Sequence, residues 1–265
     1  MSPSPRTKAT KKEPFSLVPF AVQRRLYEFV SRSMLVREHL GLQDRVHTDF
    51  AEIGAITALP ETDSVFPAPH SIGARVVRAA ALSTIEAELL QQPHAQLTKV
   101  SSDHSAAQTL LTSIMAGLLE DPKRLAVVPT TEIAEPSWQS VLRLAGRHRL
   151  PMLFIVPGRI ASKRSSSSDL RTIYAEFGVP LMTVDSNDPI AAYRVATEAA
   201  HNARAGRGAT VLEAASVESS NRLVNSQHPL EHLEEYMRRR GSWDEGWRSD
   251  LEVTLQAAMK KELTA

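Results

Sequence analysis

Short apolar runs alternate with amphipathic stretches through the second half of the chain. Between the runs at 125–128 and 151–156, apolar residues recur at helical spacing, and Gly146 is predicted to close the helix. These apolar residues are Trp138, Val141, Leu142 and Ala145. Strand, helix and strand in this order predict a parallel pair joined by a right-handed crossover. The apolar runs predicted to be strands lie at 125–128, 151–156, 181–184 and 210–214.

Predicted helices fill most of the remaining chain. An amphipathic helix is expected over 18–40, ended by Gly41, and another over 48–59, ended by Pro60. Pro189 takes the first position of a helix that runs to about Arg204. Strands that alternate with helices in this way predict an α/β fold with a doubly wound, mostly parallel sheet. Further helices are expected at 73–90, 104–119, 169–177, 230–239 and 244–261, with an extended segment at 63–69 and a strand at 97–100.

Composition and charge restrict the class of protein. The 265 residues carry a net charge of +1, so no global field favours nucleic acid or a membrane surface. The chain has no cysteine, which excludes disulfides and thiolate metal sites, and its longest apolar runs are too short to span a bilayer. We expect a cytoplasmic protein with a disordered basic tail at 1–14 and a single domain at 15–265.

The most informative positions are those that follow the predicted strands, because open parallel sheets bind ligands beyond the carboxyl ends of their strands. The segments there are PTTEIAEP after Val128 and PGRIASKR after Val156. His228 and His232 are four residues apart, but no third ligand accompanies them, so a metal site is not predicted. The GRGAT segment at 206–210 joins a helix to a strand and lies on the side of the sheet opposite to a ligand loop.

A succession of motifs then appears between residues 177 and 214. The chain has Phe177-Gly178-Val179-Pro180, then VDSND at 184–188, then ARAGRGAT at 203–210, then VLEA at 211–214. This order resembles the alpha chain of the thiamine-diphosphate-dependent 2-oxo acid dehydrogenases, the decarboxylating component of the pyruvate and branched-chain complexes. The residues that match the family's structural motif are Asp185, Asn187, Asp188, Arg204, Gly206 and Glu213.

The resemblance implies a thiamine-diphosphate-binding type fold, thiamine diphosphate and magnesium as cofactors, and a beta chain or a second copy as partner, within a 2-oxo acid dehydrogenase complex. The family holds the metal and the diphosphate through a Gly-Asp-Gly loop and an Asn-Asn pair. Those positions fall here on Pro129-Thr130-Thr131 and on Gly158-Arg159. A Tyr-Arg pair that reaches the diphosphate falls on Pro69-His70.

Three functions follow as hypotheses. The replaced ligands favour a non-catalytic, structural or regulatory alpha-like subunit. An active thiamine-dependent decarboxylating dehydrogenase is the second, with Glu132 or Glu135 supplying ligands together with a beta chain. The third is an anion-binding module that uses Arg159, Lys163 and Arg164 in the vacated site, against which stands a plain solvated loop.

Overall fold

The protein is described by a computed structural model that covers residues 18–42, 49–66, 71–80, 84–85, 125–129, 136–157, 172, 174–215 and 229–263. For Pro129, Pro157, Leu263 and residues 136–138 only the backbone is described. Several predicted features fall outside these ranges: the tail at 1–14, the strand at 97–100, the helix at 104–119 and the loop that bears Lys163 and Arg164.

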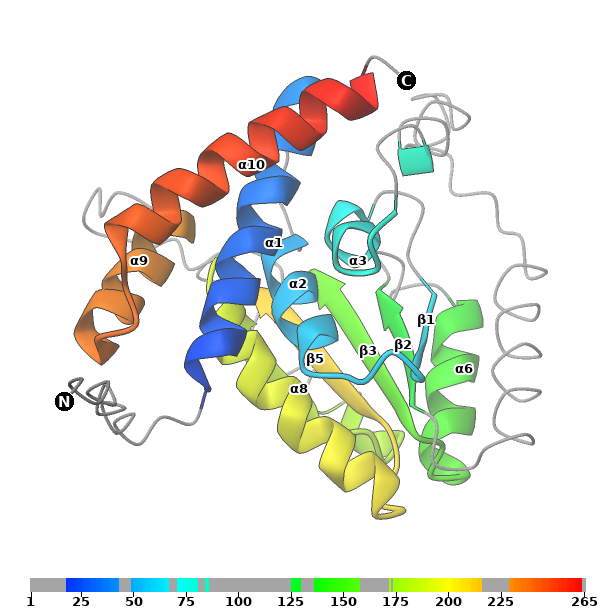
Figure 1. The fold of residues 1–265 in the computed structure, drawn as a ribbon. Coiled ribbons are helices and arrows are strands. Elements are labelled where there is room, and N and C mark those ends of the chain that lie inside the picture. The colour runs from blue at the N-terminus through cyan, green and yellow to red at the C-terminus, as the bar shows by residue number, and fades with distance from the viewer. Residues whose placement is uncertain are drawn as a thin grey trace, which may run out of the picture.

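A five-stranded, all-parallel sheet forms the centre of the molecule (Figure 1). Its strand order is β1-β2-β3-β5-β4, so the first three strands follow one another across the sheet, β4 forms the far edge, and β5 lies between β3 and β4. The predicted α/β fold with a doubly wound parallel sheet is confirmed, and it is consistent with a thiamine-diphosphate-binding type fold. The strands are β1 (Ser64–Val65), β2 (Ala126–Pro129), β3 (Met152–Pro157), β4 (Leu181–Asp185) and β5 (Thr210–Ala215).

Helices cover both faces of the sheet. On one face, α2 (Asp49–Thr57), α3 (Ile72–Val77) and α8 (Pro189–Arg204) share an apolar core with the strands. On the other face, α6 (Pro136–Arg147) and the segment around Tyr174 form a second core. Since the central strands are covered on both faces, the buried residues of β2 and β3 form continuous apolar runs, as is usual in parallel sheets.

Three further helices form a layer outside α2 and α8. These are α1 (Phe20–His39), α9 (Pro229–Arg240) and α10 (Glu245–Leu263), and Figure 1 shows α10 crossing α1 at the rim of the molecule. Leu26, Val30, Leu233 and Met237 are fully buried between them. Gly41 ends α1 with a φ of 65°, as predicted.

Two predicted helix ends are wrong. The helix expected over 73–90 ends at Val77, where Ala79 takes a φ of 55° and the guanidinium of Arg78 donates to the carbonyl oxygen of Asp63. Gly146 does not close α6 but lies one residue before its last residue, Arg147. A glycine is required there because a Cβ would overlap the carbonyl oxygen of Phe177. The left-handed residue that ends α6 is Arg149, with a φ of 52°.

Candidate functional site

The loops expected to hold a ligand leave the sheet from neighbouring strands. Pro129 is the last residue of β2 and pairs in register with Ile155 of β3, which ends two residues later at Pro157. The residues that follow these two strands therefore start at one edge of the sheet. Thr130, Thr131, Gly158, Arg159 and His70 themselves lie outside the described residues.

The acidic turn after β4 lies at the same edge. The Asp185 carboxylate accepts the backbone N–H of Asn187 at 2.9 Å, and the Ser186 N–H donates to the carbonyl oxygen of Ala215 at 2.9 Å. Asp188 is the N-cap of α8, because its carboxylate accepts the Ala191 N–H at 2.9 Å. The carboxylates of Asp185 and Asp188 therefore stabilise the turn before α8 and the first turn of that helix.

The remaining motif residues are distributed over the fold. Arg204 pairs with the buried Asp63, whose other carboxylate oxygen accepts the Leu125 N–H at 3.0 Å. Gly206, with a φ of 76°, makes the turn between α8 and β5. Glu213 is buried on β5 and accepts the Thr183 hydroxyl at 2.9 Å. The six motif residues are thus not brought together in one site, and Arg204 and Glu213 make contacts that join segments distant in the sequence.

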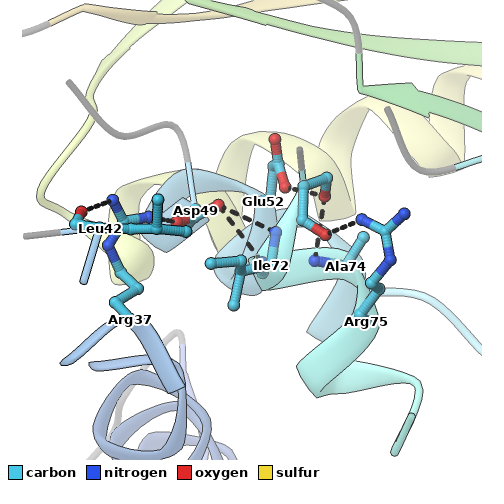
Figure 2. Close-up of polar contacts among 9 residues, drawn as sticks. Arg37, Leu42, Asp49, Glu52, Ile72, Ala74 and Arg75 are labelled. Atoms are coloured by element: carbon cyan, nitrogen blue, oxygen red, sulfur yellow. Dashed lines mark hydrogen bonds and ion pairs between the residues drawn. The ribbon is translucent and has the colours of Figure 1, made fainter. Parts of the chain in front are cut away.

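A buried polar cluster joins α1, α2 and the start of α3 (Figure 2). We call Arg37, Asp49, Glu52, Ser71 and Arg75 the Asp49 cluster. One oxygen of Asp49 pairs with the Arg37 guanidinium, and the other accepts the N–H groups of Ile72 and Gly73, each at 3.3 Å. The Asp49 carboxylate therefore connects α1 to the first turn of α3.

The other half of the cluster is centred on Ser71. Its hydroxyl donates to Glu52 and accepts the Ala74 N–H at 3.3 Å, and its carbonyl oxygen accepts from Arg75 at 2.6 Å. Ser71 directly follows His70, and Figure 1 shows α3 beyond the arrowheads of β2 and β3. By resemblance, the residues just before Ser71 are expected to reach the cofactor diphosphate. The Asp49 cluster thus anchors the chain directly after them.

Sequence reasoning did not identify the Asp49 cluster. Arg37 and Asp49 are both nearly buried, with side chains 8% and 5% exposed, although charged residues are usually placed at the surface. The sequence signal for this cluster was weak. Two acidic residues lie in the first turn of α2, but a helix N-terminus favours acidic residues with or without a partner on another helix. Their pairing with Arg37 and with the α3 backbone follows only from how the helices pack.

A tyrosine lies next to the buried Glu213. Tyr174 is 2% exposed, and its burial, together with the negative charge of Glu213, raises the pKa of its hydroxyl to about 12. The phenol is therefore neutral at physiological pH. It can donate a proton in a hydrogen bond but does not act as a base.

The described ranges give no support for a metal centre. Within them, no three His, Cys, Asp or Glu side chains are grouped so as to hold an ion. His232 lies on α9, whereas His228 lies outside the described residues.

No described helix is long and apolar enough to cross a membrane.

Comparison with known proteins shows which proteins this chain is similar to. Residues 140–264 match the family model of the dehydrogenase E1 component, a range that runs from within α6 to the end of α10. The 3-methyl-2-oxobutanoate dehydrogenase subunit alpha of Mycobacterium tuberculosis, strain H37Rv, is 29% identical over 180 residues, and the protein of strain CDC 1551 / Oshkosh matches equally. Each match covers 62% of this chain and 49% of the relative, so the chain spans about half the length of these curated relatives.

The family model, the relatives and the parallel sheet agree with the succession of motifs between residues 177 and 214. The match over residues 140–264 and the similarity to the alpha subunits support a 2-oxo acid dehydrogenase alpha-chain-like protein.

Proposed function

We propose that this protein is a non-catalytic alpha-like subunit of a 2-oxo acid dehydrogenase, with a structural or regulatory role. The observation that carries the proposal is the parallel pairing of β2 with β3, which starts the loops bearing Thr130 and Arg159 at one edge of the sheet. By resemblance, these loops replace those that hold magnesium and the cofactor diphosphate.

The chemistry of these residues does not fit that group. Magnesium prefers hard oxygen ligands such as a carboxylate or an amide oxygen. Thr130 supplies a neutral hydroxyl where the family has an aspartate, and Arg159 brings a positive charge towards a cation. One replaced ligand can be compensated by another group, but here a ligand is replaced in both loops.

The motif residues that the chain retains support a structural role. Asp188 caps α8, Arg204 holds Asp63, and Glu213 accepts from Thr183. Each of these contacts stabilises the fold and none requires a bound cofactor. A chain that retains this framework while its cofactor loops change is expected to keep a partner-binding shape.

The expected partner is a beta chain. The Mycobacterium tuberculosis relatives are named as alpha subunits, and a subunit of that kind is defined by its place in an assembly. Self-association is the alternative. Co-purification with the beta chain of the same complex, followed by light scattering, separates the two.

Calorimetric titration with thiamine diphosphate and magnesium tests the proposal. We expect no binding heat for the unaltered chain, alone or with a beta chain. A double variant, Thr130→Asp with Arg159→Asn, supplies a carboxylate and an amide and is the matched comparison. Micromolar binding by the unaltered chain would overturn the proposal.

An active enzyme is the second candidate, favoured by the names of the relatives. Both are subunits of a 3-methyl-2-oxobutanoate dehydrogenase, so a branched-chain 2-oxo acid is the substrate to try. The assay adds a beta chain, thiamine diphosphate and magnesium, and follows 2-oxo acid-dependent reduction of an artificial electron acceptor. Turnover that disappears when this chain is omitted would favour the active enzyme over the non-catalytic subunit.

A further inference from the structure

Two turns meet at the amino edge of the sheet, opposite to the cofactor loops. One joins α6 to β3 through Arg147, His148 and Arg149, and the other joins α8 to β5 through Arg207 and Gly208. A Cβ on Gly208 would lie 3.1 Å from the Cα of Arg149, so the two backbones are in contact. Figure 1 shows the ends of α6 and α8 together at the lower side of the sheet, away from the arrowheads.

These turns carry positive charge without acidic residues of their own. Arg147, His148, Arg149 and Arg207, which we call the basic edge, are all exposed. The stretches 136–150 and 199–210, from which they come, contain no aspartate or glutamate. The basic edge therefore concentrates three guanidinium groups and an imidazole on one small surface of a chain whose net charge is only +1.

The arginines of the basic edge form no ion pair within the described part of the chain. Arg207 donates to the amide oxygen of Asn202 at 2.7 Å, a contact that leaves its charge uncompensated. Asp63 is occupied by Arg204 and by the Leu125 N–H. Within the described ranges, no carboxylate forms an ion pair with Arg147, Arg149 or Arg207.

Arg149 occupies a backbone position that favours glycine. Its N–H donates to the Gly146 carbonyl at 3.2 Å and the Leu150 N–H donates to the Ala145 carbonyl at 2.9 Å, which is the usual left-handed end of a helix. An arginine is less stable than glycine at a φ of 52°. Because its side chain is exposed, packing does not explain the residue.

We propose that the basic edge is a docking surface for an acidic segment of a partner protein. Guanidinium groups bind carboxylates through paired hydrogen bonds, and three of them held on two touching turns present a fixed arrangement to an aspartate- and glutamate-rich strand or loop. A nucleic acid fits less well, since the basic edge has no aromatic side chain on which bases stack. This surface does not rest on the proposed function, which concerns the opposite edge.

Fluorescence anisotropy with a labelled oligoglutamate peptide tests the docking surface on the full chain. We expect saturable binding that weakens with added salt. The triple charge reversal Arg147→Glu, Arg149→Glu and Arg207→Glu should weaken binding by at least about tenfold. The reversal Arg25→Glu, Arg239→Glu and Arg240→Glu changes the net charge equally at exposed positions elsewhere and should bind as the unaltered chain does.

Three outcomes would overturn the proposal. They are absent binding by the unaltered chain, equal loss in both triple variants, and tighter binding of an oligothymidylate than of the peptide. Thermal melting of each variant verifies that it is folded. If the triple variant at the basic edge does not fold, the single variants Arg147→Glu and Arg207→Glu replace it, and unchanged binding in both would count against the docking surface.

Discussion

At the scale of single residues, each buried charged side chain in the described ranges has a hydrogen-bond or ion-pair partner. Asp49 is the clearest case, since its two oxygens serve Arg37 on one side and the start of α3 on the other. Asp63 is similar, with Arg204 and the Leu125 N–H. A buried charge that loses its partner is costly, so these residues are sensitive points for stability.

Asp49→Ala is expected to lower the free energy of unfolding by about 3 kcal/mol, because it leaves the Arg37 guanidinium buried without its carboxylate. Urea denaturation followed by circular dichroism measures the change. Glu235→Ala breaks an exposed pair with Arg239 and should cost at most about 0.5 kcal/mol. Equal effects of the two substitutions would show that Asp49 does not hold the helices together.

Arg149→Gly is expected to raise the free energy of unfolding by about 1 kcal/mol, since glycine adopts a positive φ without steric cost. The same variant removes one charge of the basic edge, so it should gain stability while losing affinity for the acidic peptide. Arg147→Gly, at the last residue of α6, is the comparison and should destabilise by at most about 1 kcal/mol, the cost of glycine in a helix interior. A less stable Arg149→Gly variant would contradict the strain argument.

Tyr174 is expected to make the protein less stable in alkali. Its pKa is about 12 when folded and 10.0 when free, so below pH 10 the phenol is protonated in both states and its contribution is complete. Between pH 10 and 12 the unfolded chain releases the proton first, and stability falls by up to about 3 kcal/mol. Urea denaturation at several pH values should show a smaller fall in Tyr174→Phe than in the unaltered chain, because the buried Tyr27, whose pKa burial also raises, remains in the variant.

At the scale of elements, local signals set the beginnings of helices better than their ends. Pro189 and the Asp188 cap start α8 as the sequence predicts, because both act within one turn. The end of α3 was predicted wrongly, since Arg78 and Ala80 are fixed by contacts with Asp63 and Arg32. Gly146 was misassigned as a stop signal, whereas its role is to admit Phe177 against α6.

Asp188→Ala should lower the free energy of unfolding by about 1 kcal/mol, because the first turn of α8 loses the acceptor for the Ala191 N–H. Asp188→Asn retains an acceptor oxygen and should stay within about 0.5 kcal/mol of the unaltered chain. Thermal melting with both variants measures the difference. Equal losses in both would mean that the charge of Asp188, and not its capping bond, is what matters.

At the scale of the whole molecule, one apolar core lies on each face of the sheet, and α1, α9 and α10 form an outer layer. The two ends of this sheet differ: the buried Asp49 cluster lies beyond the arrowheads of β2 and β3 (Figure 1), whereas the exposed basic edge lies where β3 and β5 begin. Arg204 connects the layers, because it reaches from the end of α8 to Asp63 between α2 and β1.

Arg204→Ala is expected to destabilise the whole domain by about 3 kcal/mol, since it leaves the Asp63 carboxylate buried with only one N–H. Arg207→Ala lies three residues away, is exposed, and should change stability by less than about 0.5 kcal/mol. Denaturation curves recorded by tryptophan fluorescence and by circular dichroism should coincide for both variants. A shift confined to one probe would indicate that Arg204 stabilises only its own turn.

The sequence by itself determined the parallel α/β architecture, most strands and helices, and the resemblance to the alpha chains. These follow from period, caps and motif order, which are written in neighbouring residues. Tertiary structure alone decided that Asp49 holds α1 to α3, that Glu213 accepts from Thr183, and that Arg149 meets Gly208. Those contacts join segments far apart in the chain, and no local pattern encodes which distant groups will meet once the layers pack.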